Sequence, residues 1–547
     1  SLTILSLLFY SSNSKYIIRC YCFSLVFNII LHTPMITNKL ILKKTALSFL
    51  ALIIIFYTSK LMLKGVGSHS SEGSAFLLSI LIIIFNSSKK AFWFVIFPIT
   101  LLYAIYSPIG LIFGSPNYQY VASIFATDLL ESKEFFSQLP LYNYLCPFII
   151  IFGLLLFRFL TVKYKIDFYK NKTILCIFIF FALLDQSPFS YFKAVIDSAQ
   201  KVKDELVNLN YTKAESTWGE SVLTDKSTYD TYVLVIGESA RKDYHSAYGY
   251  PVINTPFIST EKGLLVDGLT SGGTNTISSL RLMLTHPDKK NWEPDYTKSF
   301  IDLVNSAGIE TYWISNQGYI GEFDTPITAI AKNSTHKKFL KYSGYKSKNT
   351  SDFQLLSSIR EVIESHPRKK KLIIVHLYGS HPQACDRIDD YKLIVPVQDQ
   401  KYSYLNCYIS SINKTDDFLR DLYKILDNEY KNQNVSFSMV YFSDHGLAHR
   451  DIDGVINFNN NRISKLHYEV PLFMTSSDKF EHKTCKSFKS GLNFTDGIAG
   501  WLGIRNTHLQ SDYSLFDCQD DPDDYGLSEK IQNIPEELDP AIDIRGK

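Results

Sequence analysis

Four short segments in the second half of the chain end an apolar run on side chains that could do chemistry. The segments are "VLVIGES", "LIIVHLYGSH", "MVYFSDHG" and "TYWISNQG". The polar residues at or near their ends are Glu238, His376, His381, Asp444, His445 and Asn316. Short apolar runs of this kind predict buried strands, and ligands of open α/β sheets bind beyond the carboxyl ends of the strands. We therefore expect these carboxylates and imidazoles to gather at one edge of one sheet.

This set of side chains is typical of a transition-metal site. Carboxylate oxygens and imidazole nitrogens suit zinc, whereas a thiolate zinc site is disfavoured because the chain has no C-x-x-C pattern. A single Asp–His pair after a strand is more often a turn or a cap. Because four strand ends of one domain carry such residues, we favour the metal site.

A hydroxyl nucleophile is available in "GLTSGGTNTISSLRLMLTHP". Small residues precede Thr276, and apolar residues then recur at helical spacing up to Pro287, so we expect Thr276 to cap or open a helix. Free N–H groups and the positive end of the helix dipole favour an anion such as phosphate there. A metal nearby would lower the pKa of the hydroxyl and generate the alkoxide. An ordinary N-cap threonine fits the local sequence equally well, and only the other strand ends favour catalysis.

The remainder of the second half predicts a sheet on which these ends can meet. Expected strands cover residues 232–237, 311–315, 372–377, 438–443 and 470–475. Helical patterns cover residues 299–306, 353–364 and 408–428. Strands that alternate with helices indicate an α/β domain with a mostly parallel sheet covered on both faces.

The first half of the chain has a different composition. Up to about Phe192 it is rich in Leu, Ile and Phe and poor in acids, and its apolar runs approach the roughly 20 helical residues that cross a bilayer core. We place spans near residues 45–63, 75–86, 91–113, 141–160 and 173–189. Buried helices of a soluble domain are a poor alternative, because so many such runs follow one another closely.

Basic residues in the connecting loops predict the orientation of these spans. They cluster before the first span, between the second and third, and between the fourth and fifth, which places these loops in the cytoplasm. Lys60 and Lys64 oppose this orientation mildly. Five spans with the amino end inside place the second half outside the cytoplasm. Since the first methionine is Met35, we expect residues 1–34 to be an upstream extension; a real extra apolar segment there would reverse the topology.

The expected organisation therefore has four parts. Residues 1–34 are the extension or extra hydrophobic segment, 35–190 a transmembrane domain of about five helices, 191–230 a juxtamembrane linker helix, and 231–547 an extracytoplasmic domain. Apolar residues recur at helical spacing in the linker, which is either a plain connection or a helix in contact with lipid.

Composition also bears on partners and redox compartment. The formal net charge of +2 gives no support to nucleic-acid binding. Four cysteines fall in the extracytoplasmic part, where disulfides can form. Proximity in sequence suggests Cys385–Cys407 and Cys485–Cys518, which is one of three pairings that four cysteines allow.

The motifs "GES.R", "GGTNT", "H…GSH", "SDHG" and "HYEVPLF", in this order, resemble the phosphoethanolamine transferases that modify bacterial lipopolysaccharide. The resemblance covers the chain from about Met35 to its end. It implies a multi-domain protein, in which a five-span α-helical membrane bundle precedes an α/β domain of the sulfatase/alkaline-phosphatase type. It also implies a multi-pass protein of the bacterial inner membrane with its catalytic domain in the periplasm.

The resemblance assigns a catalytic zinc ion to Glu238, Thr276, Asp444 and His445, with Thr276 as the nucleophile. His381 in "YGSH" matches a family histidine that binds phosphate or a second zinc ion, so the number of zinc ions stays open.

The family's last site histidine follows "SDHG" at a variable distance. His467 is our choice and His449 is the alternative. We expect His381 or His467 to contact the substrate and to transfer a proton to or from a reacting oxygen. Asn316 and His376 are lesser candidates for substrate contact.

The implied reaction takes phosphoethanolamine from phosphatidylethanolamine, through a threonine-linked intermediate, to lipopolysaccharide or lipooligosaccharide. The lipid A branch of the family carries "CGT.T" with a disulfide across the nucleophile helix, whereas this chain has Gly272 and Leu282 at those positions. The sequence is closer to the branch that modifies heptose or Kdo of the core, which puts lipid A in doubt as the acceptor. The alternatives are a phosphoglycerol transferase of the same fold, acting on glucan or teichoic-acid-like glycans, and a non-catalytic membrane sensor.

Overall fold

The structure is a computed structural model. The residues that it describes are 39–67, 72–116, 121, 132, 135–136, 139–170, 190–211, 215–319, 325–342, 349–452, 454–459, 464–532 and 539–547. The expected segments at residues 1–34 and 173–189 lie outside this set. The chain divides into two compact units, made of Ser1–Gly65, His69–Tyr106 and Leu145–Pro188, and of Val66–Ser68, Ser107–Tyr144 and Phe189–Lys547.

The described part of the amino-terminal apolar region is mostly helical. It contains α2 (Lys39–Gly65), α3 (Glu72–Phe85), α4 (Lys89–Ala91), α5 (Phe97–Phe113) and α8 (Cys146–Lys163). Among the described residues, three helical stretches are long and apolar enough to cross a membrane: Lys43–Gly65, Lys89–Phe113 and Leu141–Lys163. The first, third and fourth expected spans therefore correspond to helices of membrane-crossing length, and α3 is a shorter apolar helix.

Hydrogen bonds between polar side chains connect the helices of this region. Arg158 of α8 donates from Nη1 to Oδ1 of Asn86 (2.8 Å), and Asn86 donates from Nδ2 to Oγ1 of Thr161 (3.0 Å). Ser79 of α3 donates to Oγ of Ser59 of α2 (3.0 Å). These contacts satisfy polar groups that would be costly in an apolar surrounding.

An eight-stranded sheet forms the centre of the carboxyl-terminal domain, in the order β11-β3-β10-β7-β2-β6-β4-β5. Its strands are β2 (Thr231–Gly237), β3 (Gly263–Thr270), β4 (Glu310–Tyr319), β5 (His336–Tyr342), β6 (Lys371–His376), β7 (Phe437–Ser443), β10 (Leu472–Ser476) and β11 (His482–Ser490). Only β10 runs against the others in this sheet of described residues. The predicted mostly parallel α/β sheet is confirmed.

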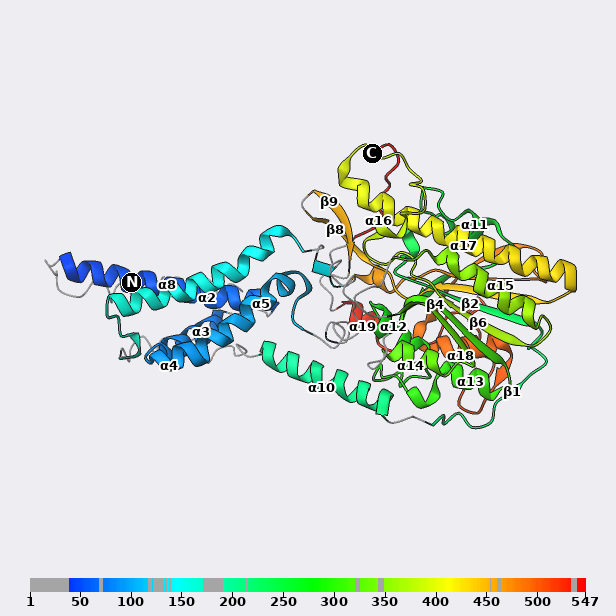
Figure 1. The fold of residues 1–547 in the computed structure, drawn as a ribbon, viewed down its shortest axis with the longest axis horizontal. Helices are drawn as coiled ribbons and strands as arrows, with labels where there is room; N and C mark the ends of the chain where they lie inside the picture. Colours follow the sequence, from blue (N-terminus) through cyan, green and yellow to red (C-terminus); the bar gives the residue numbers. More distant parts are fainter. Residues whose placement is uncertain are drawn as a thin grey trace, which may run out of the picture. The chain divides into compact units, whose positions relative to one another are not determined.

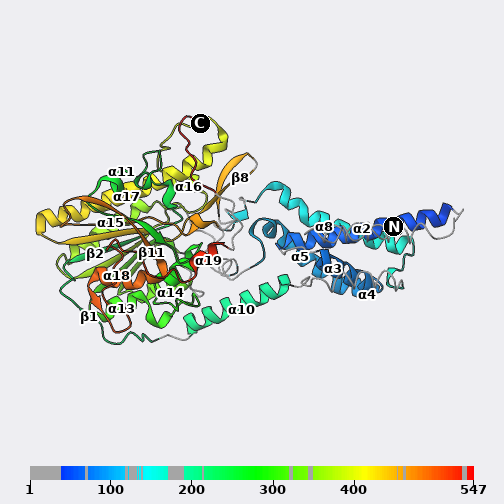
Figure 2. The ribbon, with the colours of Figure 1, turned by 180° about the vertical axis from the view of Figure 1, so that it is seen from behind.

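Helices cover both faces of the sheet (Figures 1 and 2). α11 (Pro256–Thr260), α15 (Leu355–Ser365) and α17 (Ser403–Gln433) cover one face. α12 (Thr276–Met283), α13 (Phe300–Ser306) and α18 (Phe494–Leu502) cover the other, and α14 (Pro326–Lys332) packs into the same core.

The central strand β2 shows why helices must cover both faces of the sheet. Its side chains alternate, with Val233 and Val235 in one apolar core and Leu234 and Ile236 in the other. A strand buried on both sides is a continuous apolar run, which is the pattern that predicted it.

Three strands of the sheet were not predicted from the sequence. β5 ("HKKFLKY") and β11 ("HKTCKSFKS") are the two edge strands and carry many lysines. β3 ("GLLVDGLT") is interrupted by Gly268, whose φ is +149° at its close approach to β11. Edge strands need little apolar character, because they have a neighbour on one side only.

Of the linker helix expected at residues 191–230, the part up to Tyr211 is α10 (Ser190–Tyr211), whereas residues 215–230 contain the short strand β1 (Val222–Leu223) and no helix. Glu205 of α10 forms an ion pair with Arg281 of α12 (3.2 Å) and accepts a short hydrogen bond from the hydroxyl of Tyr296. This end of α10 is thereby tied to the helix that begins at Thr276. Its contact with lipid stays a prediction.

Two further small sheets pair β1 (Val222–Leu223) with β12 (Ile504–Arg505) and β8 (Ala448–Ile452) with β9 (Val455–Asn459). The disulfides Cys385–Cys407 and Cys485–Cys518 are both present, as proximity suggested.

Candidate metal centre and nucleophile

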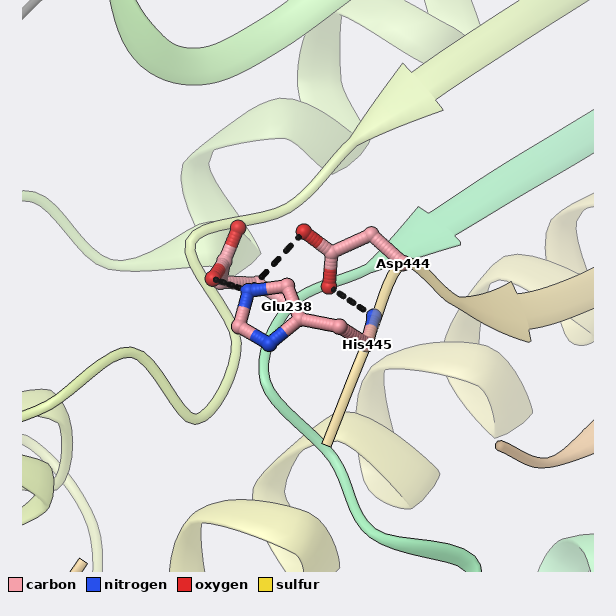
Figure 3. A group of neighbouring side chains, drawn as sticks. All are labelled: Glu238, Asp444 and His445. Atoms are coloured by element: carbon pink, nitrogen blue, oxygen red, sulfur yellow. Dashed lines mark hydrogen bonds and ion pairs between the residues drawn. The ribbon is translucent and has the colours of Figure 1, made fainter. Parts of the chain in front are cut away.

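Two neighbouring parallel strands bring three potential metal ligands together. Gly237, the last residue of β2, lies opposite Ser443, the last residue of β7, so Glu238 and Asp444 leave the sheet side by side. One ligand atom each from Glu238, Asp444 and His445 lies within 4.8 Å of the others, and all three residues are buried (Figure 3). The sheet edge predicted from the sequence is therefore where these side chains meet.

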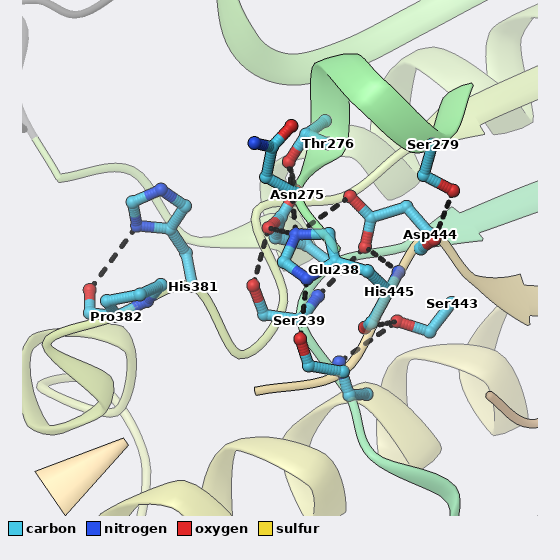
Figure 4. Close-up of polar contacts among 12 residues, drawn as sticks. Glu238, Ser239, Asn275, Thr276, Ser279, His381, Pro382, Ser443, Asp444 and His445 are labelled. Atoms are coloured by element: carbon cyan, nitrogen blue, oxygen red, sulfur yellow. Dashed lines mark hydrogen bonds and ion pairs between the residues drawn. The ribbon is translucent and has the colours of Figure 1, made fainter. Parts of the chain in front are cut away.

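Thr276 completes this group from the other side (Figure 4). Its Oγ1 donates to Oε2 of Glu238 (3.0 Å) and lies 3.4 Å from Nε2 of His445. The N-cap of α12 is Asn275, whose Oδ1 accepts from the backbone N–H of Ser278 (2.9 Å). Thr276 thus opens the helix as its first residue, and its hydroxyl is free of the capping role.

The start of α12 is fastened directly to the strand end. Ser279 donates from Oγ to the carbonyl oxygen of Asp444 (2.6 Å) and accepts from the N–H of Gly272 (3.1 Å). A Cβ at Gly273 would lie 2.8 Å from the carbonyl carbon of Ser278. The two glycines of "SGGTNT" therefore let the loop pass close to the helix, which holds Thr276 in place.

The electrostatics of the group favour a bound cation. Burial and the nearby charge of Glu238 raise the pKa of Asp444 to about 8. Burial favours neutral Glu238, but the His445 ring outweighs it and holds the pKa of Glu238 below its usual range. Burial would lower the pKa of His445, yet Asp444 and Glu238 raise it to about 9. Two buried carboxylates thus face one imidazolium, so the group lacks positive charge. A bound metal ion would supply that charge.

Hydrogen bonds orient the potential ligands. The Nδ1–H of His445 donates to the carbonyl of Gly446 (2.6 Å), which leaves Nε2 facing the carboxylates and Thr276. Ser239, with φ at +59°, donates from its backbone N–H to Oδ1 of Asp444 (2.9 Å) and from Oγ to Oε1 of Glu238 (2.6 Å). Oδ2 of Asp444 is buried without a hydrogen-bond partner. A buried carboxylate oxygen without a hydrogen-bond partner is available as a metal ligand. The donor set of two carboxylates, an imidazole and a hydroxyl fits zinc.

Sequence reasoning missed a further contact to Glu238. Gln317, at the end of β4, donates from Nε2 to Oε2 of Glu238 (3.1 Å) and to the carbonyl of Leu377 (2.8 Å). Gln317 stands next to Asn316 in "ISNQG", so this strand end could have suggested either residue. Neighbouring side chains of a strand point to opposite sides, so only one of the two can face Glu238, and the sequence does not say which.

Gln317 gives a prediction about the orientation of Glu238. We expect Gln317→Ala to lower zinc affinity or transfer rate about 10- to 100-fold, because a lost orienting hydrogen bond typically has that effect at metal sites. Zinc titration and initial rates measure it. Gln433→Ala is the matched control, since Gln433 donates to Oε2 of Glu429 at 2.9 Å near the end of α17. Wild-type affinity and rate in the Gln317 variant would contradict the prediction.

Asn316 and His376 occupy structural positions near the site. Asn316 donates from Nδ2 to Oδ1 of Asp352 (2.7 Å), and Asp352 accepts from the N–H groups of Tyr378 and Gly379 (2.9 Å each). Asn316 therefore holds the loop after β6. The ring of His376 lies edge-on to Trp313, 5.9 Å between ring centres, and burial lowers its pKa to about 4. Substrate contact by either residue stays a prediction.

The loop after β6 approaches Glu238 closely. A Cβ at Gly379, where φ is +47°, would lie 3.0 Å from the backbone nitrogen of Glu238. Two residues later, Nδ1 of His381 lies 3.3 Å from the carbonyl of Pro382, and Figure 4 shows the ring set apart from the Glu238–His445 group. Burial lowers the pKa of His381 to about 4, against the charge of Glu238.

The two candidates for the last histidine are placed differently. His467 is fully buried, with Nε2 3.0 Å from the backbone nitrogen of Ala448 and Nδ1 2.9 Å from that of Ser464, and only one of the two ring nitrogens can accept a hydrogen bond. Nδ1 of His449 lies 3.1 Å from Nη1 of Arg241. The roles of both histidines in the site stay predictions.

Arg241 of "GESAR" has a structural role. It is fully buried and forms ion pairs with Asp539 (2.8 Å) and Asp243 (2.7 Å). Burial alone would lower its pKa, but these carboxylates outweigh burial and raise it. The loop after Glu238 is thereby fastened to the carboxyl-terminal segment.

Several known proteins are similar to this chain. A family model described as Sulfatase matches residues 230–504. A protein of Haemophilus influenzae named "Putative phosphoethanolamine transferase" is 47% identical over 413 residues, which cover 75% of this chain and 85% of that protein. Phosphoethanolamine transferase OpgE of Escherichia coli K12 is 33% identical over 437 residues, which cover 76% of this chain and 80% of OpgE.

One solved structure is similar over most of the chain. It is the integral membrane protein lipooligosaccharide phosphoethanolamine transferase A (EptA) from Neisseria meningitidis, with a TM-score of 0.56 and 18% identity. The match covers 86% of this chain and 97% of EptA, and it shows a likeness of fold.

Proposed function

This chain belongs to the phosphoethanolamine transferases of the sulfatase family, and from that membership we propose that it moves phosphoethanolamine from phosphatidylethanolamine to a hydroxyl group of lipopolysaccharide. Thr276 would carry the group between two steps. The observation that carries the proposal is the Thr276 hydroxyl, 3.0 Å from Glu238 and at the amino end of α12.

In the first step, Oγ1 of Thr276 attacks the phosphorus of the donor. The bond from phosphorus to the diacylglycerol oxygen breaks, and that oxygen takes up a proton. The hydrogen bond from Thr276 to Glu238 points the hydroxyl proton at a carboxylate, so a lone pair of Oγ1 can face the phosphorus. The positive end of the α12 dipole favours the negative charge of the phosphoryl oxygens.

In the second step, a hydroxyl of the acceptor attacks the same phosphorus. The bond from Oγ1 of Thr276 breaks, and the acceptor loses its proton. We propose that His381 or His467 transfers one of these protons and contacts the substrate, with Asn316 and His376 as lesser contacts. The charge of Glu238, which acts on the His381 ring, favours His381.

We propose one catalytic zinc ion held by Glu238, Thr276, Asp444 and His445. The buried Oδ2 of Asp444, which has no hydrogen-bond partner, and the excess of carboxylate charge support this ligand set. Bound there, zinc would polarise a phosphoryl oxygen and lower the pKa of the threonine hydroxyl.

We place the protein in the bacterial inner membrane as a multi-pass protein, with residues 35–190 as the membrane domain, 191–230 as the linker and 231–547 as the catalytic domain in the periplasm. The three helices of membrane-crossing length support a membrane domain. The two disulfides support an oxidising compartment for the catalytic part. In this arrangement the acyl chains of the donor stay in the bilayer while its headgroup reaches Thr276.

We propose heptose or Kdo of the core ahead of lipid A as the acceptor, because Gly272 and Leu282 exclude a disulfide across α12. Lipopolysaccharide from cells with and without the gene should differ by phosphoethanolamine on the core, measured by mass spectrometry. A gain on lipid A, or on a periplasmic glucan instead, would refute the acceptor while leaving the reaction intact. A gain of phosphoglycerol would refute the donor.

A further inference from the structure

The carboxyl-terminal segment, residues 539–547, packs beside the loop that follows Glu238. Ala541 donates from its backbone N–H to Oδ2 of Asp243 in this loop (3.0 Å). Ile544 is fully buried in an apolar core to which the same loop contributes. Both a backbone hydrogen bond and apolar packing therefore hold the segment in its position.

Asp539, at the start of this segment, bonds to both loops that carry candidate metal ligands. Its Oδ2 accepts from Nη1 of Arg241 (2.8 Å) and from the backbone N–H of His449 (3.0 Å). Its main-chain carbonyl accepts from Nη2 of Arg241 (2.7 Å). Arg241 comes three positions after Glu238, and His449 comes four positions after His445. One residue of the carboxyl-terminal segment thus joins the two loops.

Arg241 links the same two loops directly. Its Nη1 donates to the carbonyl of Leu447 (3.2 Å), two positions after His445. Its Nε and Nη2 donate to the carboxylate of Asp243 (2.9 and 2.7 Å). Together with the two bonds to Asp539, these contacts use all five N–H groups of a guanidinium that is fully buried. We refer to Arg241 and Asp539 as the buried ion pair.

The candidate ligands lie between two points at which the loops are joined. On one side, the parallel ladder pairs Gly237 with Ser443, directly before Glu238 and Asp444. On the other side, the buried ion pair joins the loops beyond the ligands. The two ligand carboxylates repel one another, so loops joined on one side only could move apart. The second connection opposes that movement.

We propose that Asp539 is a positioning residue of the candidate metal centre, which acts through Arg241 and His449 to hold the two ligand-bearing loops at the separation that a zinc ion needs. This rests on the proposed function, since it assumes the zinc site given there. Oxygen and nitrogen ligands must lie about 2.0–2.2 Å from zinc, so a small displacement of either loop lowers the affinity. The carboxyl-terminal segment is thereby part of the site, although the ligands come from elsewhere.

The test measures the zinc affinity of the full-length protein separately from its stability. Protein stripped with a chelator is titrated with zinc against a competing indicator. We expect Asp539→Ala to bind zinc on the order of 10-fold more weakly than the wild type, at the lower end of the effect of residues that orient ligands. Asp539→Asn keeps an oxygen that can accept from Arg241 and His449, so its affinity should lie between the two.

The transfer rate provides a second readout. At saturating zinc, Asp539→Ala should return to within about threefold of the wild-type rate, because mass action fills a weakened site. Arg241→Lys keeps the charge but not the planar set of donors, so it should weaken zinc binding as Asp539→Ala does. If Asp539→Ala does not fold, Asp539→Asn and Arg241→Lys carry the same comparison.

Asp230→Ala is the matched control, because Asp230 joins β2 and β7 at the opposite edge of the sheet. It directly precedes β2, and its Oδ2 accepts from the N–H (2.9 Å) and the hydroxyl (2.8 Å) of Ser436, which directly precedes β7. The variant should lose stability and keep the wild-type zinc affinity.

Three results would overturn the proposal. Wild-type zinc affinity in Asp539→Ala would show that the buried ion pair does not act on the ligands. Equal losses of affinity in Asp539→Ala and Asp230→Ala would show a general effect of stability, and a transfer defect that excess zinc does not correct would show an effect other than metal binding. Failure of the wild-type protein to bind zinc would instead refute the proposed zinc site, and no variant is needed to see it.

Discussion

Thr276→Ala is expected to abolish the covalent phosphoethanolamine adduct and to lower transfer by more than about 10³-fold. Thr276 supplies the hydroxyl that lies 3.0 Å from Oε2 of Glu238 and 3.4 Å from Nε2 of His445. The hydroxyl of Ser279, one turn further along, is held by the carbonyl of Asp444 and cannot replace it. Intact mass after incubation with phosphatidylethanolamine measures the adduct, and peptide mapping places it.

Two variants control for loss of structure. Thr276→Ser keeps a hydroxyl at the same place and should keep a measurable adduct. Thr285→Ala removes a hydroxyl that donates to the carbonyl of Arg281 just beyond the end of α12, and it should leave the adduct unchanged. If the Thr276→Ala protein still gains the mass of phosphoethanolamine, the nucleophile is another residue.

Removal of the metal is the second change with a large expected effect. A chelator should abolish transfer and lower the unfolding temperature by several degrees, because a ligand at about 1,000 times its dissociation constant stabilises the folded state by about 4 kcal/mol. Asp444→Asn should purify without zinc, lose transfer by more than about 10³-fold, and unfold at a temperature that no longer responds to chelator. Metal analysis and thermal unfolding with and without added zinc measure these effects.

Asp416→Asn is the matched control for a buried carboxylate. Asp416 accepts from the backbone N–H groups of Phe257 and Ile258 at the start of α11, and burial raises its pKa to about 7. Its substitution should cost roughly 1 kcal/mol of stability, as for the loss of a helix cap, and leave the zinc content intact. Zinc bound to Asp444→Asn at wild-type stoichiometry would show that the ligand set is wrong.

The centre of the fold could be predicted from the sequence because burial on both faces leaves a direct pattern. The strands β2, β4, β6, β7 and β10 all overlap the expected ranges. The edge strands β5 and β11 have no such pattern, since most of their lysines are exposed to solvent, and only their pairing with β4 and β3 defines them.

The candidate site also has one part that the sequence predicts and another that only strand pairing defines. That Glu238, Asp444 and His445 lie at strand ends follows from the sequence, because a polar residue after a buried strand must leave the sheet there. That β2 and β7 are neighbours, so that these ends coincide, depends on a pairing between segments about 200 residues apart, and sequence order does not state it.

Side-chain partners were decided by tertiary structure alone. The contact of Gln317 with Glu238 and that of Thr276 with His445 each join segments that are remote in sequence. The chain by itself determined which residue types stand at the ends of buried strands, since apolar burial acts on each segment locally. Which of those residues touch was decided by strand order and register, because these are set by the packing of the whole domain.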